Sequence, residues 1–186
     1  MNTHSKPKLL VISGSSGVGK GTVIKELLKQ CPDLNLSISC TTRSKRPGEE
    51  DGVNYFFISE DEFKKSVSDN EFLEWAEFSG NFYGTKQSYI KKCLDDNKHV
   101  LLEIETQGAL QIKAKMPEAV LIFIAPPSFE ELETRLRGRH TETEEAIQKR
   151  LNFVKFELEN SKKYDYIIVN DTINNAVNKI IEIIGV

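Results

Sequence analysis

Short apolar runs and stretches of helical spacing alternate along the chain. Continuous apolar runs typical of buried strands occur at 9–12, 100–102, 120–124 and 166–169. Apolar positions that recur every three or four residues predict helices over 23–31, 88–96, 107–115, 129–137, 147–158 and 173–184. Strands separated by helices of this length indicate parallel pairing with right-handed crossovers. The pattern therefore predicts an α/β fold built on a parallel sheet.

A different pattern lies between the first helix and residue 86. Leu34, Leu36 and Ile38 alternate with polar residues, which predicts a strand over 34–38. Beyond it, short apolar stretches alternate with turns, and a helix over 61–68 has a Ser59 cap with Glu62 completing a capping box. We therefore expect residues 43–85 to form a small, mainly antiparallel insertion.

The length of 186 residues allows one core with an insertion and is too short for two ordinary domains. We expect a single domain over 1–186, whose core comprises 7–42, 86–137 and 145–186. Between the last two core segments lies the polar, glycine-bearing segment 138–144, which is suited to a mobile cover, or lid.

A glycine-rich loop follows the first strand. Its glycines let backbone N–H groups turn toward an anion, and the next helix adds its positive end, while Lys20 can reach the outer phosphates of a nucleoside triphosphate. The alternative is a plain turn, which the flanking strand and helix disfavour. We expect a nucleoside triphosphate to bind at nine successive residues: Gly14, Ser15, Ser16, Gly17, Val18, Gly19, Lys20, Gly21 and Thr22.

The metal ligands are less sharply indicated. Gly21 stands where such loops usually carry a magnesium-binding hydroxyl, and the first hydroxyl comes at Thr22. No direct protein ligand is therefore assigned with confidence, and we expect Mg²⁺ to be held largely through phosphates and water. The third strand is predicted over 100–105, and Glu103 and Glu105 project from one face at its end, so Glu103 is a candidate ligand. The alternative is a pair of solvent-facing carboxylates on an edge strand.

Cationic and phenolic side chains occur in the insertion. Arg43 and Arg46 precede Tyr55 and Tyr83, and a guanidinium fork pairs two phosphate oxygens at once. We expect them to bind a second, smaller phosphate compound, although a solvated surface would look the same in sequence.

A second set of arginines flanks the segment 138–144. Arg135, Arg139 and Arg150 could neutralise charge on a migrating phosphoryl group. Helical ion pairs are the alternative, and they account for Arg135 better than for Arg139 and Arg150.

Composition and charge limit the partners. A net charge of −3 supplies no basic field for nucleic acid, and no apolar run approaches the length of a membrane span. Three widely spaced cysteines indicate reduced thiols, so we expect a cytoplasmic protein that binds neither nucleic acid nor membrane. The sequence contains no heptad seam that would specify an oligomeric state.

The chain resembles the guanylate kinases in the order and spacing of its motifs, over residues 7–184. The motifs are GSSGVGKGT, SCTTRSKRPGEEDGVNYFF, EFLEWAEFSGNFYGT, EIETQGA, FIAPPS and RLRGRHTETEEAIQKRL. The resemblance implies the nucleoside monophosphate kinase type of P-loop fold, with a five-stranded parallel sheet, a nucleotide-binding insertion and a helical lid. It also implies transfer of the γ-phosphate of ATP to GMP, with Mg²⁺, in purine nucleotide metabolism.

The resemblance further assigns roles to individual residues. The GMP phosphate is expected at Arg43, Arg46, Tyr55 and Tyr83, guanine at Ser39, Glu74, Thr85 and Glu105, and charge stabilisation at Lys20, Arg139 and Arg150, with Arg135 a weaker candidate. Guanine carries donors at N1 and at its amino group, which a carboxylate accepts, whereas adenine has no donor at N1.

Two other functions fit a similar sequence. Non-catalytic guanylate-kinase-like modules of membrane scaffolds typically have a degraded phosphate loop, whereas this loop is intact apart from Ser15, which replaces a common proline. A related kinase of another monophosphate shares most features, but Glu74 and Thr85 disfavour it.

Overall fold

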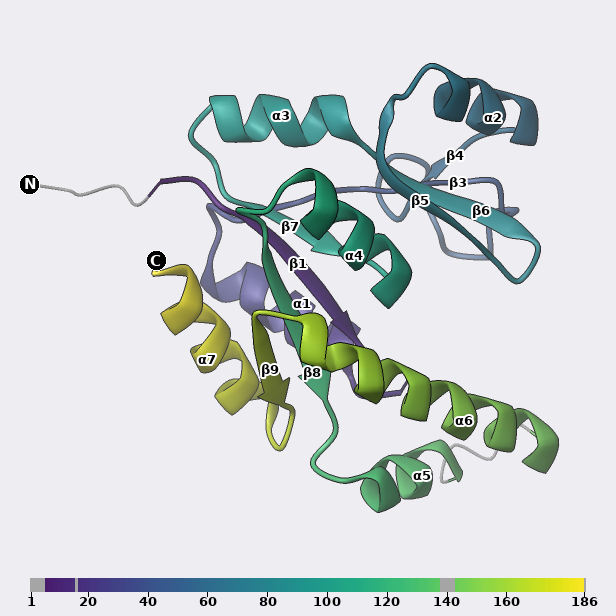
Figure 1. The fold of residues 1–186 in the computed structure, drawn as a ribbon, viewed down its shortest axis with the longest axis vertical. Helices are drawn as coiled ribbons and strands as arrows, with labels where there is room; N and C mark the ends of the chain where they lie inside the picture. The colour runs from purple at the N-terminus through teal and green to yellow at the C-terminus, as the bar shows by residue number, and fades with distance from the viewer. Residues whose placement is uncertain (1–5, 16, 138–142, 186) are drawn as a thin grey trace, which may run out of the picture.

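The core of the protein is a five-stranded parallel sheet, as the computed structural model shows for residues 6–15, 17–137 and 143–185 (Figure 1). The strands are β1 (Leu9–Gly14), β2 (Asn35–Leu36), β7 (Val100–Glu103), β8 (Val120–Ala125) and β9 (Tyr166–Val169), in the order β2-β7-β1-β8-β9. All neighbouring pairs are parallel. The predicted α/β class and parallel sheet are confirmed.

Alternate residues of the central strands bury both faces of this sheet. Leu10 and Ile12 face α1 (Lys20–Gln30) and α7 (Ile173–Ile184), whereas Leu9 and Val11 face α3 (Gln87–Asp95) and α4 (Thr106–Lys115). Strands covered on both faces read as continuous apolar runs, which is why the sequence revealed them. The remaining helices are α5 (Phe129–Arg137), α6 (Glu144–Asn160) and a 3₁₀ turn, Ser161–Lys163.

A second, smaller sheet projects from the core (Figure 1). It contains β3 (Cys40–Thr41), β4 (Phe56–Phe57), β5 (Phe72–Phe78) and β6 (Asn81–Lys86), in the order β4-β3-β6-β5. The pairs of β6 with β3 and β5 are antiparallel, while β3 and β4 are parallel. Helix α2 (Glu60–Ser68) covers this sheet, and the predicted capping box is present at its start.

The strand predicted over 34–38 is wrong in its extent. Only Asn35–Leu36 pairs with the core sheet. The Ser37 N–H still donates to the carbonyl of Leu101, but Ser39 already accepts a hydrogen bond from Phe56 in the small sheet. The chain therefore passes from one sheet to the other within three residues, which alternation alone cannot reveal.

The third core strand is also shorter than its pattern. It ends at Glu103, and Glu105 is the N-cap residue of α4 rather than part of the strand. Strand β7 lies between β2 and β1, so the edge-strand alternative for its carboxylates is wrong.

Part of the predicted lid lies outside the described residues. These are 138–142, which include Arg139, and Ser16 in the phosphate loop is outside them as well. Arg135 lies on α5 and Arg150 on α6, and only their backbone is described. Among the helices described, none is both long and apolar enough to cross a bilayer.

Candidate active site

The glycine-rich loop begins where β1 is packed most tightly. A Cβ on Gly14 would lie 2.5 Å from the carbonyl oxygen of Ile124 on β8, so only glycine allows this approach of the two strands. Gly17 and Gly19 have φ angles of +84° and +90°, a conformation that disfavours other residues. Helix α1 begins directly after them, at Lys20, and its positive end faces the loop.

Asn170 holds the loop from the opposite side. Asn170 directly follows β9 in the chain and is 5% exposed. Its Nδ2 donates a hydrogen bond of 2.8 Å to the carbonyl of Val18. Sequence reasoning missed this residue, because nothing local to Asn170 indicates a partner 152 residues earlier in the chain. A second bond closes the turn within the loop, from the Val18 N–H to the Ser15 carbonyl.

The residues after Lys20 bear on the metal. A Cβ on Gly21 would meet no atom within 4 Å, so a hydroxyl is absent there for no steric reason. Thr22 lines a separate hollow beside Lys25 and Thr172, away from the cavity that Lys20 lines. No group of three acidic, histidine or cysteine side chains able to hold a metal occurs within the described part of the chain.

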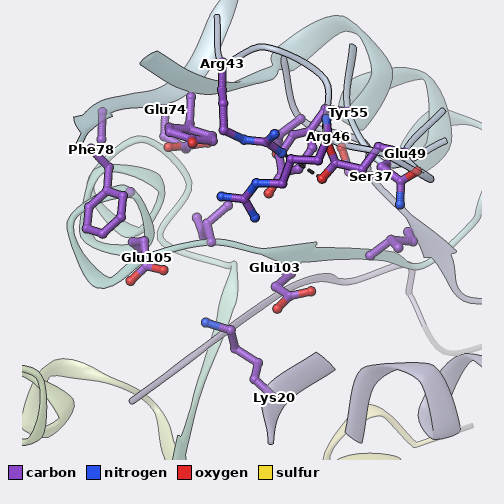
Figure 2. Close-up of a pocket in the computed structure, with 17 residues that line it drawn as sticks. Lys20, Ser37, Arg43, Arg46, Glu49, Tyr55, Glu74, Phe78, Glu103 and Glu105 are labelled. Carbon is purple, nitrogen blue, oxygen red and sulfur yellow. Dashed lines mark hydrogen bonds and ion pairs between the residues drawn. The ribbon is translucent and has the colours of Figure 1, made fainter. Parts of the chain in front are cut away.

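A cavity of about 380 Å³ is lined by residues of both the core and the insertion. Figure 2 shows Lys20 on one side, Arg43 and Arg46 on the other, and Glu103 between them. The structure thus brings together nine of the residues singled out from the sequence: Lys20, Ser39, Arg43, Arg46, Tyr55, Glu74, Tyr83, Glu103 and Glu105.

The cationic end of the cavity is organised around Arg43. Its guanidinium donates to Glu49 Oε1 at 2.8 Å and to the Ser44 carbonyl at 2.7 Å, and its Cζ lies 5.5 Å from the Tyr55 ring. Glu49 also accepts from the Arg46 N–H at 2.8 Å. The hydrogen bond from Arg43 lowers the pKa of Glu49, so the pair is ionic. These contacts hold the arginine fork in one orientation.

Two phenols complete this end. The rings of Tyr55 and Tyr83 are 6.0 Å apart in an edge-to-face contact. Burial raises the pKa of Tyr55, which keeps its hydroxyl protonated and able to donate a hydrogen bond.

Another part of the cavity contains a buried acid. Glu74 on β5 is 4% exposed, and its Oε1 accepts a hydrogen bond of 2.6 Å from the Thr85 hydroxyl on β6. Burial raises the pKa of Glu74, while the Thr85 hydrogen bond and the charge of Lys115 act in the opposite direction. A buried carboxylate is a strong acceptor for a ligand's N–H groups. Thr85 does not line the cavity itself and supports Glu74 from behind.

Comparison with known proteins agrees with this geometry. A family model described as guanylate kinase matches residues 6–185. The chain belongs to the guanylate kinase family. It is 51% identical to the guanylate kinase of Prochlorococcus marinus, over 95% of this chain and 96% of that protein. It is 50% identical to that of Halalkalibacterium halodurans, over 94% of this chain and 86% of that protein.

A solved structure gives the same answer for the fold. The crystal structure of guanylate kinase from Anaplasma phagocytophilum superposes with a TM-score of 0.80 at 35% identity, covering 97% of this chain and 86% of that one. The resemblance inferred from the motifs is therefore confirmed, together with the P-loop type of fold.

Several cavity residues of this guanylate kinase fold escaped the sequence reasoning: Leu36, Ser37, Glu49, Asn54, Ala76, Phe78, Ile104 and Gly108. Glu49 stands next to Glu50, and only the folded turn shows which of the two reaches Arg43. Phe78 follows Glu74 by four residues on β5, so strand alternation could have placed it on the same face.

Proposed function

We propose that the chain transfers the γ-phosphate of ATP to GMP, giving ADP and GDP. The observation that carries the proposal is the buried Glu74 carboxylate, which shares one cavity with the arginines of the insertion and with Lys20 of the phosphate loop. Membership of the guanylate kinase family supports the same activity. The three cysteines of the chain are unpaired and buried, which fits a protein of the reducing cytoplasm.

In this proposal the insertion binds both ends of GMP, the phosphate and the guanine base. The forks of Arg43 and Arg46 and the hydroxyls of Tyr55 and Tyr83 bind the phosphate. At the other end Glu74 accepts from guanine N1–H and the amino group.

The remaining contacts to guanine complete this reading. Ser39 and Glu105 add hydrogen bonds to the base from the core side of the cavity, and Thr85 keeps Glu74 in position. AMP would leave the buried carboxylate without its partner, and such a loss gives polar sites discrimination of ~10⁴-fold.

The phosphoryl transfer takes place at the phosphate loop of the core. A phosphate oxygen of GMP attacks the γ-phosphorus, the bond between that phosphorus and the β,γ-bridging oxygen breaks, and the electron pair leaves with ADP. Lys20 and the backbone N–H groups of Gly14–Thr22 hold the triphosphate and neutralise the charge on the migrating group. Arg139 and Arg150, with Arg135 in a lesser role, add positive charge when the lid closes over both nucleotides.

Magnesium fits this site as an ion carried by the nucleotide. Glu103 would be the carboxylate that helps to hold such an ion, because it lies between Lys20 and the arginines of the insertion in the shared cavity (Figure 2). When bound, Mg²⁺ neutralises charge on the β- and γ-phosphates. The protein's own part is to present Glu103 and to leave room for coordinated water at Gly21.

A panel of monophosphates tests the proposal. In a coupled assay of ADP release with GMP, AMP, CMP and dTMP, the rate with GMP should exceed the others by orders of magnitude. Equal rates with AMP would contradict the base assignment. A chain that consumes no ATP with GMP and Mg²⁺ would overturn the proposed activity and leave the binding-module alternative.

The variant Glu74→Gln tests the acid that carries the proposal. It should lower kcat/KM for GMP by roughly 100-fold, because the amide has no charge and replaces one of the two acceptor oxygens with an NH2 donor that faces the donors of guanine. It should spare the KM for ATP. Glu77→Gln, on the exposed part of the same strand, is the matched control. Unchanged kinetics in Glu74→Gln would remove Glu74 from the site.

A further inference from the structure

Gly108 on α4 lies directly against the carboxylate of Glu74. A Cβ on Gly108 would stand 2.5 Å from Glu74 Oε2, 3.1 Å from its Cδ and 3.3 Å from Ile104 Cδ1. Gly108 is the third residue of α4 and does not have a positive φ angle, so the helix backbone does not require glycine. Alanine would favour a helix there by about 1 kcal/mol. Glycine is therefore needed for space and not for conformation.

The Glu74 carboxylate has little freedom to move away from a side chain at position 108. Glu74 is 4% exposed, and its other oxygen is held by Thr85 at 2.6 Å. The slot has Thr85 on one wall and the α-carbon of Gly108 on the other. A methyl group at 108 would have to displace the carboxylate by about 1 Å to reach ordinary contact.

The same face of α4 also holds the backbone on either side of Glu74. Gln111 donates from Nε2 to the Trp75 carbonyl at 2.9 Å and accepts from the Trp75 N–H at 3.3 Å. Lys115 donates from Nζ to the Leu73 carbonyl at 2.6 Å. Residues 108, 111 and 115 are spaced by three and four, so they share one helix face. This face of the core helix therefore binds strand β5 of the insertion on both sides of Glu74, the residue that reads the base in the proposed function.

We propose that Gly108 is a specificity-determining position: its missing side chain forms the slot that aims the Glu74 carboxylate at guanine, and Gln111 and Lys115 keep β5 at the depth this requires. The inference rests on the proposed function, in which Glu74 reads guanine. A displacement of 1 Å at a positioning group can cost ~100-fold in rate. Selection of the base is thus built partly into a core helix that itself offers no side chain to the nucleotide at this position.

The variant Gly108→Ala separates this role from plain packing. It should melt within a few degrees of the parent, because the helix preference of alanine offsets part of the cost of displacing the buried carboxylate. Its KM for GMP should rise roughly 10- to 100-fold while the KM for ATP stays unchanged. Gln107→Ala, on the exposed side of the same helical turn, is the matched control and should keep the parental kinetics.

A double-mutant cycle that combines Gly108→Ala with Glu74→Asp adds a second test. It measures the coupling between the two positions in GMP affinity, which a purely structural role of Gly108 would not produce. Glu74→Asp withdraws the carboxylate by one methylene, so the methyl of Gly108→Ala should then cost little. The double variant should bind GMP no worse than Glu74→Asp alone, whereas the same glycine change in the parent costs 10-fold or more.

The outcomes are distinct. Parental GMP kinetics in Gly108→Ala, an equal rise in both KM values, or additive losses in the cycle would each overturn the proposal. Parental kinetics in Glu74→Gln would overturn the base-reading role of Glu74 and the slot with it. If the parent transfers no phosphate, the proposed activity fails, and calorimetric titration of the same variants with GMP then decides the claim about Gly108.

Discussion

The core sheet and the inserted sheet differ in the side chains that stabilise them. Strand β1 lies in the middle of five parallel strands with every residue buried, and aliphatic side chains fill both of its faces. The inserted sheet has a small core in which Phe63 stacks on Phe72 at 4.5 Å and on Phe82 at 5.4 Å. One region is a rigid scaffold with a deep core, and the other is a thin layer held by a few aromatic rings.

In the proposed function the two regions also bind ligands by different means. The core presents backbone N–H groups, whose geometry depends on glycines and on the packing of β1 against β8. The insertion presents side chains, each held by a neighbour, as Glu49 holds Arg43 and Thr85 holds Glu74. Backbone groups suit a phosphate chain that every nucleoside triphosphate shares, whereas selection of one base needs individual side chains. Substitutions in the two regions should therefore change different kinetic constants.

The largest effect is expected from the core. Lys20→Met should lower kcat by roughly 10³-fold, because it removes a positive charge aimed at the migrating phosphate. Calorimetric affinity for GMP should stay close to that of the parent. Lys25→Met, an exposed lysine one turn later on α1, serves as the control. A large loss of GMP affinity in Lys20→Met would break the division between the two regions.

The matching change in the insertion is Arg43→Lys. Lysine keeps the charge but loses the planar fork and its hold on Glu49, so the KM for GMP should rise roughly 10- to 30-fold. The KM for ATP should not change. Lys45→Ala removes an exposed charge two residues away and should leave both constants as they are. Steady-state kinetics with each nucleotide varied in turn would measure this, and an equal rise in both KM values would argue against separate duties.

The smallest effect concerns stability. Because burial raises the pKa of Glu74, the folded protein holds this proton more tightly than the unfolded chain, and the parent loses stability as pH rises through the raised pKa. Glu74→Gln should therefore be more stable at pH 8, by about 1 kcal/mol or roughly 2–4 °C in melting temperature. The gain should shrink as pH falls toward 4.5, the ordinary value for this group.

Thermal unfolding of the nucleotide-free protein across this pH range measures the difference. Glu77→Gln, exposed on the same strand, should show no comparable gain. A parent that is as stable as Glu74→Gln at every pH would mean that the buried carboxylate carries no penalty.

Local patterns were sufficient for the core sheet and the phosphate loop. Buried parallel strands are continuous apolar runs, and the loop is a contiguous segment between a strand and a helix, so both are visible in neighbouring residues. The motifs were also specific enough to indicate the family, which the family model confirmed. The roles assigned to individual site residues stay predictions, those of the arginines at 139 and 150 included.

Tertiary structure alone decided how the site is supported. The passage of the chain between the two sheets after Leu36, the choice of Glu49 as the partner of Arg43, and the hold of Asn170 on the loop join segments that no local pattern connects. The slot at Gly108 is the clearest case, because the position looks in sequence like an ordinary weak point of a helix. Its meaning depends on Glu74, 34 positions earlier, and an approach of this kind exists only once α4 has packed against β5.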